Sequence, residues 1–216
     1  MNLLKILMAT AALSASVGVY AQVTGALGGG SNFLSLSLSE PFPCAPCTLG
    51  PGAATIVGGT TYDEDLSYAH VPAGSVFQNR FLAAGATSTN PSTMTFTTPT
   101  QYISFLWGSP ETYNVLITNY LMGATPLSAS FTAASLGFPV INDPSFSQYV
   151  HFSAAAGTVI TSLQFRSSIG ATSIDAFEVT NFSVTRPIPI PEPEIYALMF
   201  AGLGALGFFA RRRKRA

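Results

Sequence analysis

The sequence predicts an all-β fold, an antiparallel β-sandwich or jelly roll, with an N-terminal signal peptide and a single C-terminal hydrophobic helix. Between the two ends, short alternating or β-rich runs follow one another, separated by Gly, Pro, Asn and Ser. No helical period longer than about two turns interrupts them. Charged residues make up only 9% of the 216 residues, against about 25% in ordinary soluble proteins. These observations divide the chain into residues 1–21, 22–186 and 187–216.

Residues 1–21 are predicted to be a secretory signal peptide. Lys5 gives a positive start, residues 6–15 form a short apolar stretch, and small residues precede the expected cleavage between Ala21 and Gln22. The composition then changes abruptly to Thr, Gly and Ser, which argues against the alternative of a buried first helix. We expect the Sec-type export machinery to be a partner, and the mature protein to begin at Gln22 outside the cytoplasm.

Residues 22–186 are predicted to form one β-sandwich domain. Runs such as NFLSLSLS, QYISFLWGS, TYNVLITNY and TVITSLQFRSS are short and are bounded by turn residues, with no helix between them. In one run, Ile103, Phe105 and Trp107 point the same way, toward the expected core. In the last run, Phe177 and Val179 share one phase and Phe182 takes the other. Either a bulge at residues 180–181 resets the register, or something else covers the second half of that run.

The only cysteines, Cys44 and Cys47, stand in the sequence PCAPC. Because an exported protein meets oxidising conditions, we expect them to form a local disulfide that closes a Pro-rich loop. A reversible redox pair is the alternative, since the adjacent prolines restrict the backbone. A zinc site would have to draw its other ligands from distant parts of the sequence.

The charges of the middle region exclude one class of partner and point to no catalytic residues. Residues 22–190 contain three Arg, no Lys and eight acids, so a nucleic-acid surface is not expected. No serine lies in a G-x-S-x-G sequence, and His70 and His151 have no adjacent nucleophile. Asp175 and Glu178 are three residues apart and would lie on opposite faces of a regular strand, so they are not expected to act as a pair.

Two weaker sites remain open in the same domain. Asp63 and Asp65 belong to a tight acidic group that either binds Ca²⁺, the one cofactor considered, or is a solvated loop without a metal. Trp107, Tyr113 and Asn114 either form a carbohydrate-binding patch or, for Trp107, serve as a core anchor between the sheets.

Residues 187–216 combine a Pro-rich linker, an uncharged stretch at 195–210 and a basic tail at 211–216. As a helix at about 1.5 Å per residue, the uncharged stretch would span roughly 24 Å, which is short for a bilayer. The tail begins with Arg211, Arg212 and Arg213 and should stay cytoplasmic by the positive-inside rule. We therefore expect a transient transmembrane helix that anchors the domain on the exported side.

The triplet Pro191-Glu192-Pro193, the short Gly- and Ala-rich helix and the terminal Arg run together resemble the PEP-CTERM sorting signal. The resemblance implies recognition and cleavage near Pro193 by an exosortase, a membrane-embedded cysteine transpeptidase-like enzyme. It also implies an exported protein of Gram-negative bacteria or cyanobacteria, linked to exopolysaccharide and biofilm. Ice-binding proteins carry the same signal, which by itself implies no ice binding.

Two segments of the middle region are also similar to a family of exosortase-dependent surface proteins. These segments are YISFLWGSPETYNVLI, and FRSS followed by AFEVTNFSV; the family has a W-G-S-x-D-x-Y-N-like segment and a terminal A-F-E-x-D-N strand. Glu111 and Thr180 stand where that pattern has Asp. We therefore expect a non-enzymatic protein of the cell surface or extracellular matrix that associates with polysaccharide. The alternative is a carbohydrate-binding, adhesin-like module that depends on Ca²⁺.

Overall fold

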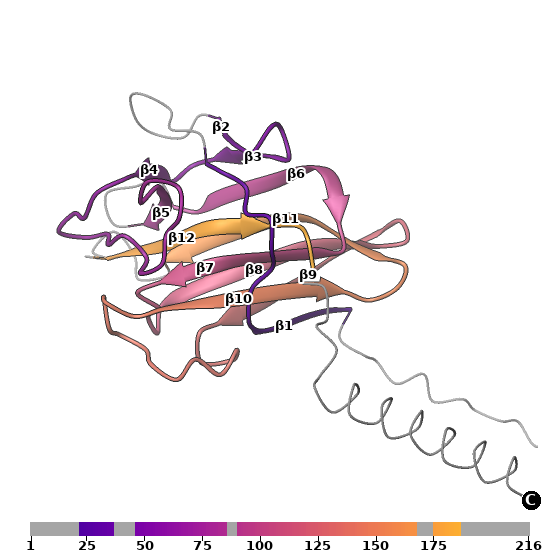
Figure 1. Ribbon diagram of the computed structural model, residues 1–216. Helices are drawn as coiled ribbons and strands as arrows, with labels where there is room; N and C mark the ends of the chain where they lie inside the picture. The colour runs from indigo at the N-terminus through magenta and orange to yellow at the C-terminus, as the bar shows by residue number, and fades with distance from the viewer. Residues whose placement is uncertain (1–21, 37–45, 86–89, 168–174, 187–216) are drawn as a thin grey trace, which may run out of the picture.

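The computed structural model describes residues 22–36, 46–85, 90–167 and 175–186. These residues form two six-stranded antiparallel sheets that pack face to face (Figure 1). The predicted all-β sandwich is confirmed. The predicted signal peptide, C-terminal helix and basic tail lie outside the described residues. Within the described ranges, no helix is long and apolar enough to cross a membrane.

The two sheets combine strands that are distant in the sequence. The first sheet has the order β1-β10-β7-β12-β5-β4. Its strands are β1 (Val23–Leu27), β4 (Thr60–Tyr62), β5 (Phe81–Gly85), β7 (Tyr102–Gly108), β10 (Ser147–Ala154) and β12 (Ala176–Ser183). The second sheet has the order β2-β3-β6-β11-β8-β9. Its strands are β2 (Cys47–Leu49), β3 (Ala54–Val57), β6 (Ser92–Thr100), β8 (Asn114–Met122), β9 (Thr125–Thr132) and β11 (Thr158–Ser167).

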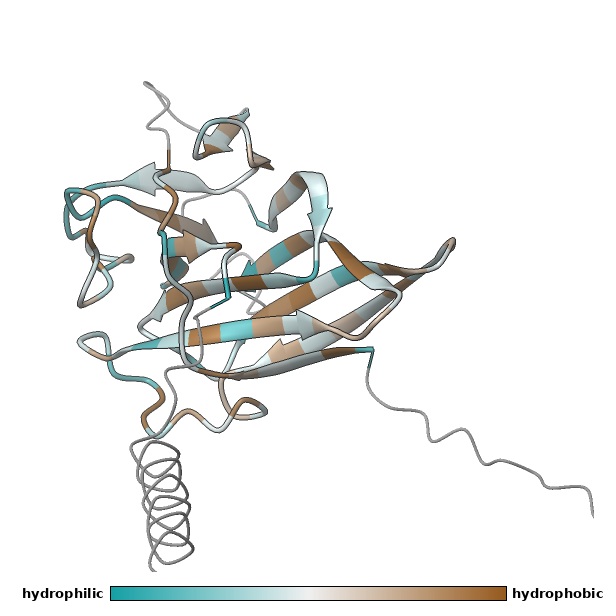
Figure 2. Ribbon diagram, turned by 45° about the vertical axis from the view of Figure 1, so that its right-hand side comes forward, coloured by the Kyte–Doolittle hydropathy of each residue, from teal (hydrophilic) through white to brown (hydrophobic). Residues whose placement is uncertain are grey.

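The core lies between the sheets and follows the alternation of the sequence. Figure 2 shows brown apolar bands alternating with paler and teal bands along the long strands. Ile103, Phe105 and Trp107 all point into this core, as predicted, and are fully buried. The Trp107 ring stacks on Phe177 of β12, with centroids 4.2 Å apart, and Phe165 of β11 meets Phe177 edge-on at 5.4 Å. Aromatic side chains from both sheets therefore join the two layers.

The outer face of β7 is buried as well, which the alternating pattern does not predict. Tyr102, Ser104 and Leu106 are at most 4% exposed. Residues 28–36 cover part of this face, where the amide of Gly30 donates to Ser104 Oγ at 2.7 Å. Residues 66–79, which we call the cover loop, lie over another part, and Gly74 stands next to the side chain of Leu106. The first sheet is thus enclosed on both sides at its centre.

A bulge in β12 resolves the change of phase in the last run. The register between β12 and β7 shifts between Thr180 and Ser183, and Asn181 has a positive φ of 51°. The extra residue returns Phe182 to the core, where it is fully buried. Of the two alternatives left open by the sequence, the bulge is the one that the structure has.

The strand directions define two opposite ends of the sandwich. At one end, which we call the terminal pole, the amide of Ala155 donates to Gln22 O and the Arg186 guanidinium lies 5.7 Å from the Tyr102 ring centroid. The first and last described residues of the domain therefore lie at the same pole. At the other end, the distal pole, β7 ends at Gly108 and β12 begins at Ala176.

Candidate functional site: an acidic cluster at the distal pole

Three carboxyl groups come together at the distal pole from two segments far apart in the sequence. Glu178 in β12 pairs in register with Gly108, the last residue of β7. The loop that follows Gly108 carries Glu111, and Asp175 immediately precedes β12. The Glu111 and Asp175 side chains are hydrogen-bonded to each other. The register of two neighbouring strands thus assembles the site, which we call the acidic cluster.

Glu178 is the most unusual member because it is fully buried on the outer face of the first sheet. Its neighbours Phe177 and Val179 point into the core, so the strand alternation directs Glu178 the other way. Its Oε1 accepts a hydrogen bond from the His70 amide at 3.3 Å, whereas Oε2 has no partner within the described part of the chain. Burial and, next, the charge of Asp175 raise the pKa of Glu178 well above its ordinary value.

Glu111 and Tyr113 form the part of the cluster contributed by the β7–β8 loop. Burial, opposed by a hydrogen bond from Tyr113 and reinforced by Asp175, raises the pKa of Glu111 from 4.5 to about 8. Burial also raises the pKa of Tyr113, with the hydrogen bond to Glu111 as the next cause. Two carboxyl groups that share a hydrogen bond need a proton between them, and the raised pKa of Glu111 allows Glu111 to carry that proton near neutral pH.

No positive side chain neutralises the cluster within the described residues. The one ion pair found there joins His70 Nδ1 to Asp65 Oδ1 at 3.9 Å, outside the cluster. The guanidinium of Arg80 donates instead to the main-chain oxygen of Leu36 at 3.1 Å. A buried carboxylate without a cation is costly, and protonation removes that cost. The arrangement is therefore suited to holding and exchanging protons.

The cover loop is held on the first sheet at several points. The main-chain oxygen of Tyr68 accepts from the Ala176 amide at 2.9 Å, and the Ala73 amide donates to Ser147 Oγ at 2.8 Å. At its first half, the His70 amide binds Glu178, and Pro72 packs against Gly108. At its second half, Asn181 accepts from the Val76 amide at 3.0 Å and donates to Gly74 O at 2.8 Å. Asn181 Nδ2 also donates to the Tyr149 hydroxyl at 2.7 Å. The first half is thus held by the Glu178 carboxyl group and one main-chain hydrogen bond, whereas Ser147 and Asn181 hold the rest through groups that do not titrate.

The predicted carbohydrate patch does not form a surface. Trp107 and Asn114 are fully buried, because β7 and the inward face of β8 both line the core. Tyr113 is half-buried and its hydroxyl is bonded to Glu111. The core-anchor alternative for Trp107 is the one that the structure has.

The two aspartates considered for Ca²⁺ lie in an exposed turn at the start of the cover loop. Asp65 Oδ1 accepts from the Val71 amide at 2.7 Å and so helps to shape the loop, while Asp63 is exposed. Among the described residues, no group of three Asp, Glu, His or Cys side chains is arranged to hold a metal ion.

The structure describes only some of the other residues that the sequence analysis singled out. Cys47 is buried in β2 and disulfide-bonded, while Cys44 lies outside the described residues. His151 is a half-buried strand residue of β10 whose ring stacks on Tyr102. The cleavage residue Ala21 and the sorting residues Pro191, Glu192, Pro193, Arg211, Arg212 and Arg213 also lie outside the described residues.

The strand alternation gave a wrong prediction for Asp175 and Glu178. Asp175 and Glu178 were expected on opposite faces of one strand, but Asp175 stands before the first residue of β12, so the alternation does not apply to it. Its main chain turns there, and its Oδ1 accepts from the Ala176 amide at 3.1 Å. The segments YISFLWGSPETYNVLI and AFEVTNFSV, which the sequence analysis singled out together, contribute Glu111 and Glu178 to the same cluster.

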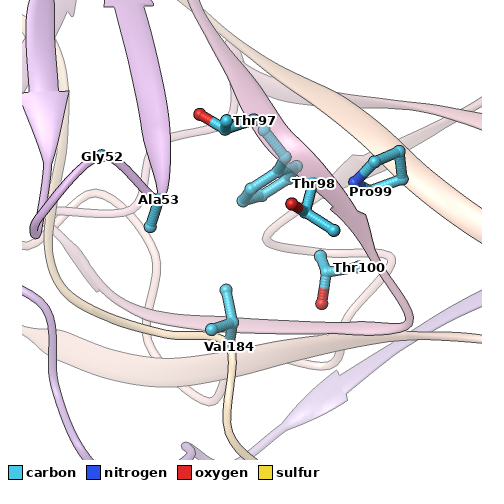
Figure 3. Close-up of a pocket in the computed structure, with 8 residues that line it drawn as sticks. Gly52, Ala53, Thr97, Thr98, Pro99, Thr100 and Val184 are labelled. Atoms are coloured by element: carbon cyan, nitrogen blue, oxygen red, sulfur yellow. The ribbon is translucent and has the colours of Figure 1, made fainter.

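Hollows are also found away from the acidic cluster. One, of about 290 Å³, lies at the terminal pole, where Thr98, Thr100 and Val184 face a common space (Figure 3). Another, of about 400 Å³, lies on the outer face of the second sheet and is lined by Asn119, Ser128 and Ser162 among others. Neither contains a carboxyl group, so neither resembles an acid–base catalytic site.

Comparison with known proteins adds information about the C-terminal end of the chain. Residues 189–214 match the family model described as the PEP-CTERM protein-sorting motif. No curated protein and no solved structure matches the chain. The matched range contains the Pro-Glu-Pro triplet and the bases from Arg211 to Lys214. The chain therefore carries a PEP-CTERM protein-sorting motif, the signal of an exported surface protein that is processed by an exosortase-type enzyme.

Proposed function

We propose that this protein is a non-enzymatic component of the extracellular matrix that binds neutral exopolysaccharide through the outer face of its second sheet. Its signal peptide would direct it through Sec-type export, and its C-terminal helix would hold it in the membrane until processing near Pro193. No metal or other cofactor enters this function. The observation that carries the proposal is a row of uncharged polar side chains across five strands of the second sheet.

The row follows from the register of the strands. Thr55 pairs with Thr95, Thr95 with Ser162, Ser162 with Asn119, and Asn119 with Ser128. Residues opposite one another share a face, so these five side chains point outward together. Asn119 Nδ2 donates to Ser162 Oγ at 2.9 Å within the row. Neighbouring strands lie about 4.8 Å apart, so the row spans roughly 19 Å.

The chemistry of this face favours a neutral, hydroxyl-rich partner. Arg166 is the only charged residue in the strands of the second sheet, which makes the face unsuited to a nucleic acid or an anionic membrane surface. Protein interfaces are depleted in Ser and enriched in aromatic residues, unlike this row. Hydroxyl and amide groups both donate and accept hydrogen bonds, as sugar hydroxyls do.

Binding can be tested with charge substitutions on a single edge strand. Ser128→Glu places a carboxylate in the row, whereas Thr125→Glu places one on the same exposed strand, β9, outside the row. In affinity electrophoresis through gels that contain purified neutral exopolysaccharide, we expect Ser128→Glu to lose retardation and Thr125→Glu to keep it. Equal retardation of both variants and the unchanged protein would contradict the proposed face. Shortening of the polysaccharide chains during incubation would contradict the non-enzymatic role.

Sorting is tested separately by fractionation and intact-mass analysis. In a host with the sorting enzyme, we expect the segment after the Pro-Glu-Pro region to be lost and the remainder to reach the surface or matrix. In the same host without the enzyme, the protein should keep its full C-terminal segment and be found in the membrane fraction. A full-length chain that persists in the inner membrane of the sorting-competent host would refute this part.

A further inference from the structure

We propose that the acidic cluster is a pH-sensitive switch, in which bound protons keep the first half of the cover loop closed over the distal pole of the first sheet. As the pH rises and the protons leave, that half opens, whereas the second half stays attached. The inference concerns the distal pole alone and is independent of the polysaccharide proposal.

Burial of Glu178 makes its ionised form unstable in the closed arrangement. Its side chain is fully buried, Oε2 has no hydrogen-bond partner among the described residues, and the donors to the carboxyl group are main-chain amides, that of His70 and its own. If Glu178 ionises, the charge must be hydrated or it must leave the buried site. His70 and Pro72 of the cover loop lie at this point of the sheet, so their displacement, which would also break the main-chain bond between Tyr68 and Ala176, is the direct way to admit water.

The groups around Glu178 make its ionised form still less stable in the closed arrangement. The turn before β12 brings the Asp175 carboxyl group, and the β7–β8 loop brings Glu111, which becomes negative on deprotonation, together with Tyr113, whose raised pKa keeps it neutral. From the cover loop, the His70 ring faces Asp65 at 3.9 Å. The cluster therefore gains repulsion and no compensating positive charge from these elements as protons are lost.

The raised pKa values set the direction of the switch and the pH range in which it acts. Burial raises the pKa of Glu111 from 4.5 to about 8, and the pKa of Glu178 is raised in the same direction. The closed pole thus holds protons that the open pole has released above about pH 4.5. Closure is favoured in acid and weakens as the pH rises from about 4.5 toward 8.

Opening would uncover an apolar surface. Ala69 of the cover loop packs with Phe81, Ala83 and Ala176 in a small cluster on the outer face of the first sheet. These side chains are fully buried in the closed arrangement. Release of the first half of the loop would expose the strand residues of that cluster to solvent.

Hydrogen exchange of the processed protein, purified from a sorting-competent host, tests the switch between pH 5 and 8. After correction for the intrinsic exchange rate, we expect opening of residues 66–72 to increase about tenfold per pH unit for each proton released. Residues 74–79 should show no such change, because Asn181 holds them. Parallel pH dependence in both halves, or in neither, would overturn the proposal.

Two variants and one control separate the switch from general instability. Glu178→Gln and the less buried Glu111→Gln remove a titrating group, and either one should reduce the pH dependence of residues 66–72. Asp143→Asn is the matched control, because the Asp143 side chain is bonded to Ser145 and these hydrogen bonds lower its pKa, so it does not titrate in this range. If both Gln variants retain the full dependence, the cluster is not the switch. If about 1 mM Ca²⁺ at pH 8 restores protection of residues 66–72, the cluster binds a cation in place of protons and the proposal is wrong.

Discussion

Replacing Phe177 with Ala should remove the central contact between the two sheets. Phe177 is fully buried, and its ring lies 4.2 Å from that of Trp107 and 5.4 Å from that of Phe165. A Phe→Ala change in a core costs about 3–5 kcal/mol, because apolar contacts are lost and a cavity remains. For a domain of this size, each kcal/mol lowers the Tm by about 2–4 °C, so we expect a loss of roughly 6–20 °C.

The lone tryptophan supplies the assay. Trp107 is the only Trp in the chain, so its fluorescence during thermal unfolding reports on this contact, and circular dichroism of the same sample reports on the sheets. Phe33→Ala is the control, since Phe33 is half-buried and stacks on Tyr149 at the outer face. The reasoning about the core would be refuted if Phe177→Ala lowered the Tm by less than about 3 °C, or no more than Phe33→Ala did.

Two other substitutions test the backbone and the cover loop. Gly85→Ala should cost about 1–3 kcal/mol more than Gly123→Ala: both glycines have positive φ, but only at Gly85 would the new methyl group collide with Ser167. Equal stability of the two variants in urea unfolding would contradict this. Asn181→Ala should cost about 2–4 kcal/mol, because the hydrogen bonds to Val76, Gly74 and Tyr149 are lost, and a loss below about 1 kcal/mol would show that the bulge does not depend on them.

The sequence was sufficient to predict the sandwich because its strands have one clear inward face. The alternation of Ile103, Phe105 and Trp107 is a local property, and the chain preserves it in the folded protein. The same is true of the change of phase near Asn181, which required a bulge or a cover and turned out to be a bulge.

The acidic cluster could not be predicted in this way, because it depends on a register between distant strands. Glu111 and Glu178 come together only because Gly108 pairs with Glu178. Nor does the pattern of β7 reveal that residues 28–36 and 66–79 cover its outer face. Alternation assigns a side chain to a face, but it does not say which distant segment lies over that face.

The position of β12 has a mechanical consequence. This strand lies between β7 and β5 and runs toward the terminal pole, where the described domain ends at Arg186. A load applied at Arg186 would pull along the strand, at right angles to its hydrogen bonds with both neighbours. Those bonds would then resist in shear and share the force, instead of opening one after another. The segment that leads from the domain to the sorting motif therefore continues from one of the inner strands of the first sheet.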